Sequence, residues 1–350
     1  MRNTPKIHVF LDANVVIQEG RKVISPALER VVELVDGGFI DVYTTQLTKA
    51  EIAKKHIEND FNLIKDFGRA HVRERLNEVM AYALPAITKE EIRESLDKRY
   101  QELVESLFQR LNARTISIDG VKPSQVLDAY TRQTGFFSGE GKKDQFPDAF
   151  IFEALRTVAT GEAPMVIISN DGDFDGPVRG DPAFEKLKTL PALFEKLGFE
   201  VDAPDVADFL KAHHDMLVEL FDAEVMDNGI VVSDVDGAEI DESTVTEVQL
   251  GLLSVFRSTK DDGDILVTGH ATLDIGVYYT HPDWDHASWD SEDKVAIPHQ
   301  DVTGFQDVEV DTRFAMAIAV DENGDPSEIT GVSLVGHRFG LMVSIQEFER

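Results

Sequence analysis

Residues 7–14 read Ile-His-Val-Phe-Leu-Asp-Ala-Asn, a short apolar run that ends in an acidic residue. A second run, over 165–173, reads Met-Val-Ile-Ile-Ser-Asn-Asp-Gly-Asp and ends in the same way. Short apolar runs bounded by turn-forming residues are typical of buried strands. Up to about residue 200 such runs alternate with stretches of helical spacing, which is typical of parallel β-α-β units. The sequence therefore predicts an α/β fold with a central parallel sheet.

Acidic residues recur where these predicted strands end or where the next helices begin. In chain order they are Asp12, Glu51, Asp148, Asp171 and Asp173. Thr45 or Thr48 can cap the helix that carries Glu51. In an open parallel sheet, ligands bind at the carboxyl ends of the strands. Because the chain has no cysteine and these side chains offer oxygen ligands, a hard divalent cation such as Mg²⁺ or Mn²⁺ is expected there.

The order of these acids resembles the PIN domain, a family of metal-dependent nucleases, over about residues 1–200. The family's motifs are matched by Asp12 with Asn14, by Thr45 followed by Glu51, by Asp148-Ala149 and by Ser169 to Phe174. The resemblance implies a three-layer α/β/α domain in which Asp12, Glu51, Asp148, Asp171 and Asp173 serve as metal ligands and catalytic residues. It leaves open whether Asp171 or Asp173 is the ligand.

Four further residues are expected to support this site: Asn14, Thr45, Asp144 and Ser169. Asn14 and Ser169 could hold metal-bound waters or orient the carboxylates. Asp144 is a candidate for an additional acid just outside the ligand set. The resemblance implies hydrolysis of phosphodiester bonds by a metal-dependent nuclease, above all an endoribonuclease acting on RNA rather than DNA.

A nuclease also needs cations that contact phosphate. The candidates are Lys54 and Lys55, one turn after Glu51, and Lys142 and Lys143, on a glycine-rich loop over 135–146. The competing interpretation is a solvated helix face. Two other functions stay open: a non-catalytic PIN-like module that binds nucleic acid or protein, and a metal-dependent phosphatase. The complete set of acids argues against the first.

The pattern changes near residue 203. A helix is expected over 205–226, followed by alternating strands near 229–235, 245–257, 264–280, 307–320, 328–336 and 339–346. These features predict a PIN-like domain over 1–203, with a helical elaboration over about 50–114, and an antiparallel β-rich (α+β) domain over 204–350.

The charge of the chain is unevenly distributed. Residues 1–200 hold 27 Lys and Arg against 32 Asp and Glu, whereas residues 201–350 hold 7 against 33. The second half should therefore repel nucleic acid. No apolar run reaches the length of a membrane span, and the N-terminus lacks the pattern of a signal peptide. We expect a cytoplasmic protein without a membrane partner, and the sequence leaves a homodimer open.

Overall fold

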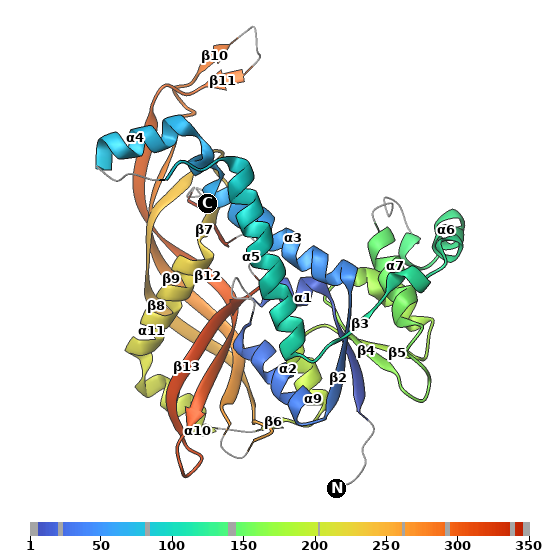
Figure 1. Cartoon of the computed structure of the whole chain (residues 1–350). Helices are drawn as coiled ribbons and strands as arrows, with labels where there is room; N and C mark the ends of the chain where they lie inside the picture. The colour runs from blue at the N-terminus through green and yellow to red at the C-terminus, as the bar shows by residue number, and fades with distance from the viewer. Residues whose placement is uncertain are drawn as a thin grey trace. The chain divides into compact units, whose positions relative to one another are not determined.

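The computed structural model describes residues 6–19, 24–80, 85–138, 145–201, 204–260, 263–290, 295–336 and 340–345 (Figure 1). The chain divides into two compact units. The N-terminal unit comprises Met1–Ile17 and Leu28–Gly198, and the C-terminal unit comprises Gln18–Ala27 and Phe199–Arg350. The segment Gln18–Ala27, here called the strap, thus belongs to the unit that is remote from it in sequence.

The N-terminal unit is built on a five-stranded sheet in which every strand pair is parallel. Its strands are β1 (Ile7–Leu11), β2 (Ile40–Thr45), β3 (Arg114–Ile116), β4 (Met165–Ile168) and β5 (Phe184–Leu187), in the order β3-β2-β1-β4-β5. The predicted parallel sheet is confirmed. The strand order reverses between β1 and β4, where Leu11 lies opposite Ile168. Such a switch point opens a crevice at the carboxyl ends of the two strands.

Helices flank this sheet, consistent with the predicted α/β/α layers. They are α1 (Ala13–Gln18), α2 (Pro26–Asp36), α3 (Gln46–Ile64), α4 (Ala70–Met80), α5 (Lys89–Arg110), α6 (Pro123–Arg132), α7 (Phe146–Leu155), α8 (Asp175–Arg179) and α9 (Leu190–Lys196). Short 3₁₀ turns add η1 (Lys65–Gly68), η2 (Ile118–Gly120), η3 (Gly135–Phe137) and η5 (Gly172–Phe174). Helix α5 packs along α3 (Figure 1). The sequence Thr88-Lys89-Glu90-Glu91 predicts a capping box at its start, and in the structure the side chains of Thr88 and Glu91 each accept a hydrogen bond from the other's backbone N–H.

Some element boundaries differ from the sequence-based predictions. Apolar residues at helical spacing over 22–36 predict one helix there. In the structure that helix begins only at Pro26, because proline suits the first turn of a helix. The short helix α1 was not expected. The sequence also predicts short strands over 187–190 and 116–118. The first lies at 184–187 instead, since Thr189 accepts a hydrogen bond from the Ala192 backbone N–H and starts α9 there. The second lies at Arg114–Ile116.

The C-terminal unit contains the predicted antiparallel β-rich sheet. Five strands lie in the order β13-β12-β9-β8-β6: β6 (Glu200–Val201), β8 (Glu239–Phe256), β9 (Ile265–Pro282), β12 (Asp301–Val320) and β13 (Pro326–Val335). Small pairs are formed by β7 (Ile230–Val232) with β14 (Leu341–Val343) and by β10 (Ser288–Asp290) with β11 (Val295–Ile297). Strands β8, β9 and β12 are longer than predicted because their pairing continues beyond the most apolar residues.

Two helices pack on this sheet where one was predicted. Helix α10 (Pro204–Ala212) ends before His213, whose ring nitrogen contacts the Phe209 carbonyl at 2.8 Å, and α11 (His214–Asn228) follows. The core includes Phe221 from α11 and Phe314 from β12, whose rings meet edge to face at 5.6 Å. None of the helices in the described ranges is long and apolar enough to span a membrane.

The strap is held inside the C-terminal unit by polar contacts. The Gly336 N–H donates to the Gln18 carbonyl at 2.8 Å. The Glu19 carboxylate is buried and accepts a hydrogen bond from the Ser25 hydroxyl at 2.7 Å, and the positive charge of Arg313 acts on it.

Candidate active site

The centre of the candidate site is a hydrogen-bonded group at the switch point between β1 and β4. Asp12 directly follows β1 and is buried, and its Oδ2 accepts a hydrogen bond of 2.6 Å from the Ser169 hydroxyl after β4. The Asp12 N–H also donates to the Ile168 carbonyl at 3.0 Å. Asn14, in the first turn of α1, donates from Nδ2 to the same hydroxyl at 3.4 Å. Ser169 therefore ties the ends of two strands together at the carboxylate of Asp12.

Glu51 is presented by the second turn of α3. The helix begins directly after β2, because Thr45 accepts a hydrogen bond from the Thr48 backbone N–H at 3.1 Å. The two threonine hydroxyls also lie 2.9 Å apart, and both side chains are fully buried. Of the two threonines that the sequence offered as caps, Thr45 is the one that caps the helix, and it fixes the start of the helix that carries Glu51.

Asp148 lies in the first turn of α7, directly after Pro147. A carboxylate there is favoured by the free backbone N–H groups and the dipole of the helix. The preceding Gln145 occupies the cap position but makes no side-chain cap bond.

Asp171 and Asp173 lie on the turn that leads from β4 into η5 and α8. The Asp171 N–H donates to the Ser169 hydroxyl at 3.1 Å, and the Asp173 N–H donates to Asp171 Oδ1 at 2.9 Å. The Lys186 ammonium on β5 donates to the Asp171 carbonyl oxygen and pairs with the Asp175 carboxylate. Lys186 was not singled out from the sequence. Only the pairing of β5 with β4, which sets Lys186 opposite Ile167, brings it to this turn.

The acids act on one another electrostatically, so the structure brings them to one place. Burial raises the pKa of Asp12 to about 6, with further increases from Glu51 and Asp171, although the Ser169 hydrogen bond lowers it. Burial also raises the pKa of Asp148 to about 7, and repulsion from Asp12, Glu51, Asp171 and Asp173 adds to this shift. Desolvation and like charges both disfavour an ionised carboxyl group.

The chemistry of this group suits a hard divalent cation, but the side chains are not arranged around one. Within the ranges that the structure describes, no three His, Asp or Glu side chains are placed to hold a metal ion. Two amide oxygens, Asn14 Oδ1 and Gln145 Oε1, are buried without a hydrogen-bond partner among the described residues. Asn14 shares the Ser169 hydroxyl with Asp12, so its amide lies at the carboxylate group. Oxygen donors of this kind match what Mg²⁺ and Mn²⁺ bind.

Of the four lysines predicted to contact phosphate, the structure describes two. Lys54 and Lys55 lie on α3, and both are within ion-pair distance of Glu58, at 3.8 and 3.4 Å. Exposed pairs of this kind are weak, so either lysine can exchange its partner. Lys142, Lys143 and Asp144 lie outside the described residues.

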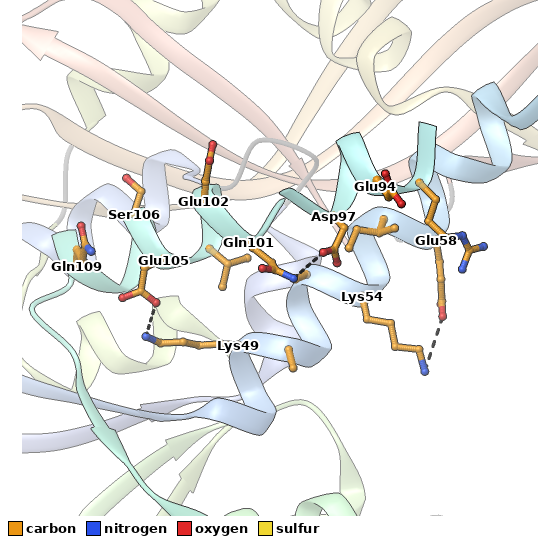
Figure 2. Close-up of a pocket in the computed structure, with 15 residues that line it drawn as sticks. Lys49, Lys54, Glu58, Glu94, Asp97, Gln101, Glu102, Glu105, Ser106 and Gln109 are labelled. Atoms are coloured by element: carbon orange, nitrogen blue, oxygen red, sulfur yellow. Dashed lines mark hydrogen bonds and ion pairs between the residues drawn. The ribbon is translucent and has the colours of Figure 1, made fainter. Parts of the chain in front are cut away.

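A large groove of about 1040 Å³ lies elsewhere on the N-terminal unit, between α3 and α5. Figure 2 shows its polar rim, including Lys54 beside Glu58 and Lys49 beside Glu105. None of the five candidate acids lines it. The groove gathers no acid whose pKa is raised by burial, in contrast to the site of Asp12 and Asp148.

Comparison with known families finds a match over the part of the chain that carries the candidate acids. Residues 9–174 match the family model described as PIN domain, and the match ends before Phe199, where the larger part of the C-terminal unit begins. The matched range includes Asp12, Glu51, Asp148, Asp171 and Asp173. The comparisons matched no curated protein and no solved structure to the chain. The N-terminal part of the chain, over residues 9–174, therefore belongs to the PIN domain family.

Proposed function

We propose that the protein is a metal-dependent nuclease, and specifically an endoribonuclease. The observation that carries this proposal is the mutual electrostatic action of the five acids at the carboxyl ends of the sheet, together with the raised pKa values of Asp12 and Asp148. Strongly perturbed acids gathered at one site mark functional sites more often than structural ones. The match to the PIN domain family supports the same reaction class.

In this proposal Asp12, Glu51 and Asp148 hold the cation together with an acid of the turn after β4. Asp171 is the better candidate of the two turn acids, because it raises the pKa of both Asp12 and Asp148, and acts on Asp148 more strongly than Asp173 does. A bound Mg²⁺ or Mn²⁺ would activate water and offset the charge that develops on the scissile phosphate. Ser169 orients Asp12, and Thr45 fixes the helix of Glu51.

The proposed substrate is RNA. The residues proposed to contact its phosphates are Lys54, Lys55, Lys142 and Lys143. The choice of RNA over DNA follows the similarity to the PIN domain family, and the comparison of the two polymers in the experiment below tests it. A non-catalytic module would bind RNA without cutting it, and a phosphatase would release phosphate from small esters. Both alternatives are outcomes of the experiment below.

The test is cleavage of end-labelled single-stranded RNA and DNA by the full chain with Mg²⁺ or Mn²⁺. Asp12→Asn and Asp148→Asn should each lower the rate at least about 100-fold, since each removes one charge from the cation site. Glu29→Gln is the matched control, because Glu29 is an exposed acid of the same unit that pairs with Arg110. Its cleavage rate should stay at the wild-type value.

The results separate the three functions. Metal-dependent RNA cutting that both Asp variants lose supports the nuclease. Binding of RNA without cutting in any metal points to the non-catalytic module. Release of phosphate from a small ester, with intact RNA, points to the phosphatase. Cutting that survives both substitutions contradicts the assignment of the site.

A further inference from the structure

Lys186 is a nearly buried cation directed at the turn that carries two of the candidate acids. Its side chain is 8% exposed. The ammonium donates to the backbone carbonyl of Asp171 and to the carboxylate of Asp175, four residues further along the same turn. It therefore bridges the beginning and the end of the segment 171–175. Lys186 also lies beyond the range that matches the PIN domain family.

Burying an ammonium group is costly unless hydrogen bonds and an opposite charge replace its water. Lys186 receives both from the turn, one from a carbonyl oxygen and one from a carboxylate. The hydrogen bond from Lys186 is the largest of the effects that lower the pKa of Asp175. Asp175 is thereby committed to Lys186, and the two residues act as one clamp.

The turn needs such a clamp because it concentrates negative charge. Asp171 and Asp173 both repel Asp148, and Asp171 also repels Asp12. On the other side the turn is held by the bond from the Asp171 N–H to the Ser169 hydroxyl. Between these two anchors, the Asp173 N–H bonds Asp171 Oδ1 and sets the orientation of that carboxylate.

We propose that Lys186 is a positioning residue, which holds the turn 171–175 so that Asp171 faces Asp12 and Asp148 in the arrangement that a divalent cation requires. The inference rests on the proposed function in one respect, namely that the cation binds at these acids. For the effect of removing Lys186 on cation affinity, it predicts the opposite sign to that expected from the charge alone. Removing a nearby positive charge should strengthen cation binding, whereas losing the position of Asp171 should weaken it.

The experiment is a calorimetric titration of the full chain with Mn²⁺. Lys186→Met removes the ammonium and keeps the length of the side chain. Its Mn²⁺ affinity should fall by about 10-fold or more, as for other residues that orient metal ligands. Lys186→Arg, which retains the charge and the donors, should recover part of the affinity. Lys196→Met is the control, because Lys196 pairs with Glu185 of the same strand and is not bonded to the turn.

A second readout keeps this inference separate from the proposed function. Hydrogen exchange of the segment 170–176 should become faster in Lys186→Met and stay unchanged in Lys196→Met. If wild type binds no Mn²⁺, the proposed function fails, and the exchange rates alone decide whether Lys186 holds the turn. If Lys186→Met does not fold, Asp175→Asn replaces it, because Asp175 is an exposed partner in the same clamp.

Two outcomes would overturn the proposal. The first is Mn²⁺ affinity in Lys186→Met equal to or tighter than that of wild type. The second is exchange of the segment 170–176 at the wild-type rate in Lys186→Met, or in Asp175→Asn if that variant takes its place.

Discussion

At the scale of single residues, desolvation disfavours the ionised form of three acids in the described part of the chain, of which Asp12 and Glu19 are buried and Asp148 is half-buried. Burial raises the pKa of Asp12 to about 6, of Asp148 to about 7 and of Glu19 to about 7. The first two lie among other carboxylates, as a cation site requires. Glu19 lies instead in the strap, where its neighbours are Ser25 and Arg313. Desolvation thus raises the pKa of acids both at the candidate site and in the strap.

Glu19 should make the stability of the C-terminal unit depend on pH. Burial raises its pKa to about 7 in the folded chain, against an ordinary value of about 4.5, so between these pH values the folded chain holds a proton that the unfolded chain releases. The free energy of unfolding should therefore fall as the pH rises from about 4.5 to about 7, by at most about 3 kcal/mol. The variant Glu19→Gln can still accept the hydrogen bond from the Ser25 hydroxyl but has no proton to release. In this variant the free energy of unfolding should therefore fall less between these pH values.

The measurement is urea unfolding at several pH values, followed by a probe in the C-terminal unit. Glu322→Gln is the control, because it removes an exposed acid from a turn of the same unit. A pH dependence that is identical in wild type and Glu19→Gln would show that Glu19 is ionised in the folded protein.

At the scale of elements, two helices of the N-terminal unit begin with a threonine N-cap, but only one of them carries a candidate acid. Thr45 caps α3 and Thr88 caps α5, each by accepting a hydrogen bond from the backbone N–H three residues later. Helix α3 carries Glu51, whereas α5 carries none of the candidate acids. Helix α5 packs along α3 and supports it from outside the site.

Thr45→Ala and Thr88→Ala should each lower the free energy of unfolding by about 1 kcal/mol, the usual effect of losing such a cap. Only Thr45→Ala should also weaken Mn²⁺ binding, because its helix start positions Glu51. Thr45→Ser, which keeps the accepting oxygen, should restore both properties. Urea unfolding and Mn²⁺ titration measure the two effects, and equal loss of Mn²⁺ affinity in both alanine variants would contradict a specific role for Thr45.

At the scale of the whole molecule, the dominant property is negative charge. The chain carries a formal net charge of −31, with 33 of its 65 acids in residues 201–350. A polyanion such as RNA therefore approaches against a repulsive field, and local cations must act at short range. The groove between α3 and α5 has more acidic than basic residues on its rim, so Lys54 on that rim is one of the cations that must act at short range.

Salt should then speed the encounter with RNA rather than slow it. Raising the ionic strength from about 0.01 M to about 0.1 M shortens the screening length from about 30 Å to about 10 Å. At constant Mn²⁺, kcat/KM for a short RNA should rise at least about twofold over this range. Mn²⁺ affinity measured at both salt concentrations provides the control for ion competition. A steady fall of kcat/KM with salt would mean that a cationic surface governs the encounter instead.

Much of the fold could be predicted because its signals are local. The apolar runs of β1 and β4, the cap at Thr45 and the capping box at Thr88 depend on residues a few positions apart. The boundaries of β5 and of the helices near Pro26 and His213 were predicted less well. There a single cap, a proline or a side-chain contact outweighs the periodicity of the segment.

The candidate site could be predicted only as a set of residue types at strand ends. The sequence by itself determined that acids follow β1, open α7 and follow β4, because strand and helix ends are encoded by neighbouring residues. The tertiary structure alone decided that Ser169 bonds Asp12, 157 positions away, and that Lys186 clamps the turn of Asp171. It also decided that the strap belongs to the C-terminal unit. The physical reason is that strand order, burial and mutual repulsion arise from contacts between distant residues, which no local pattern contains.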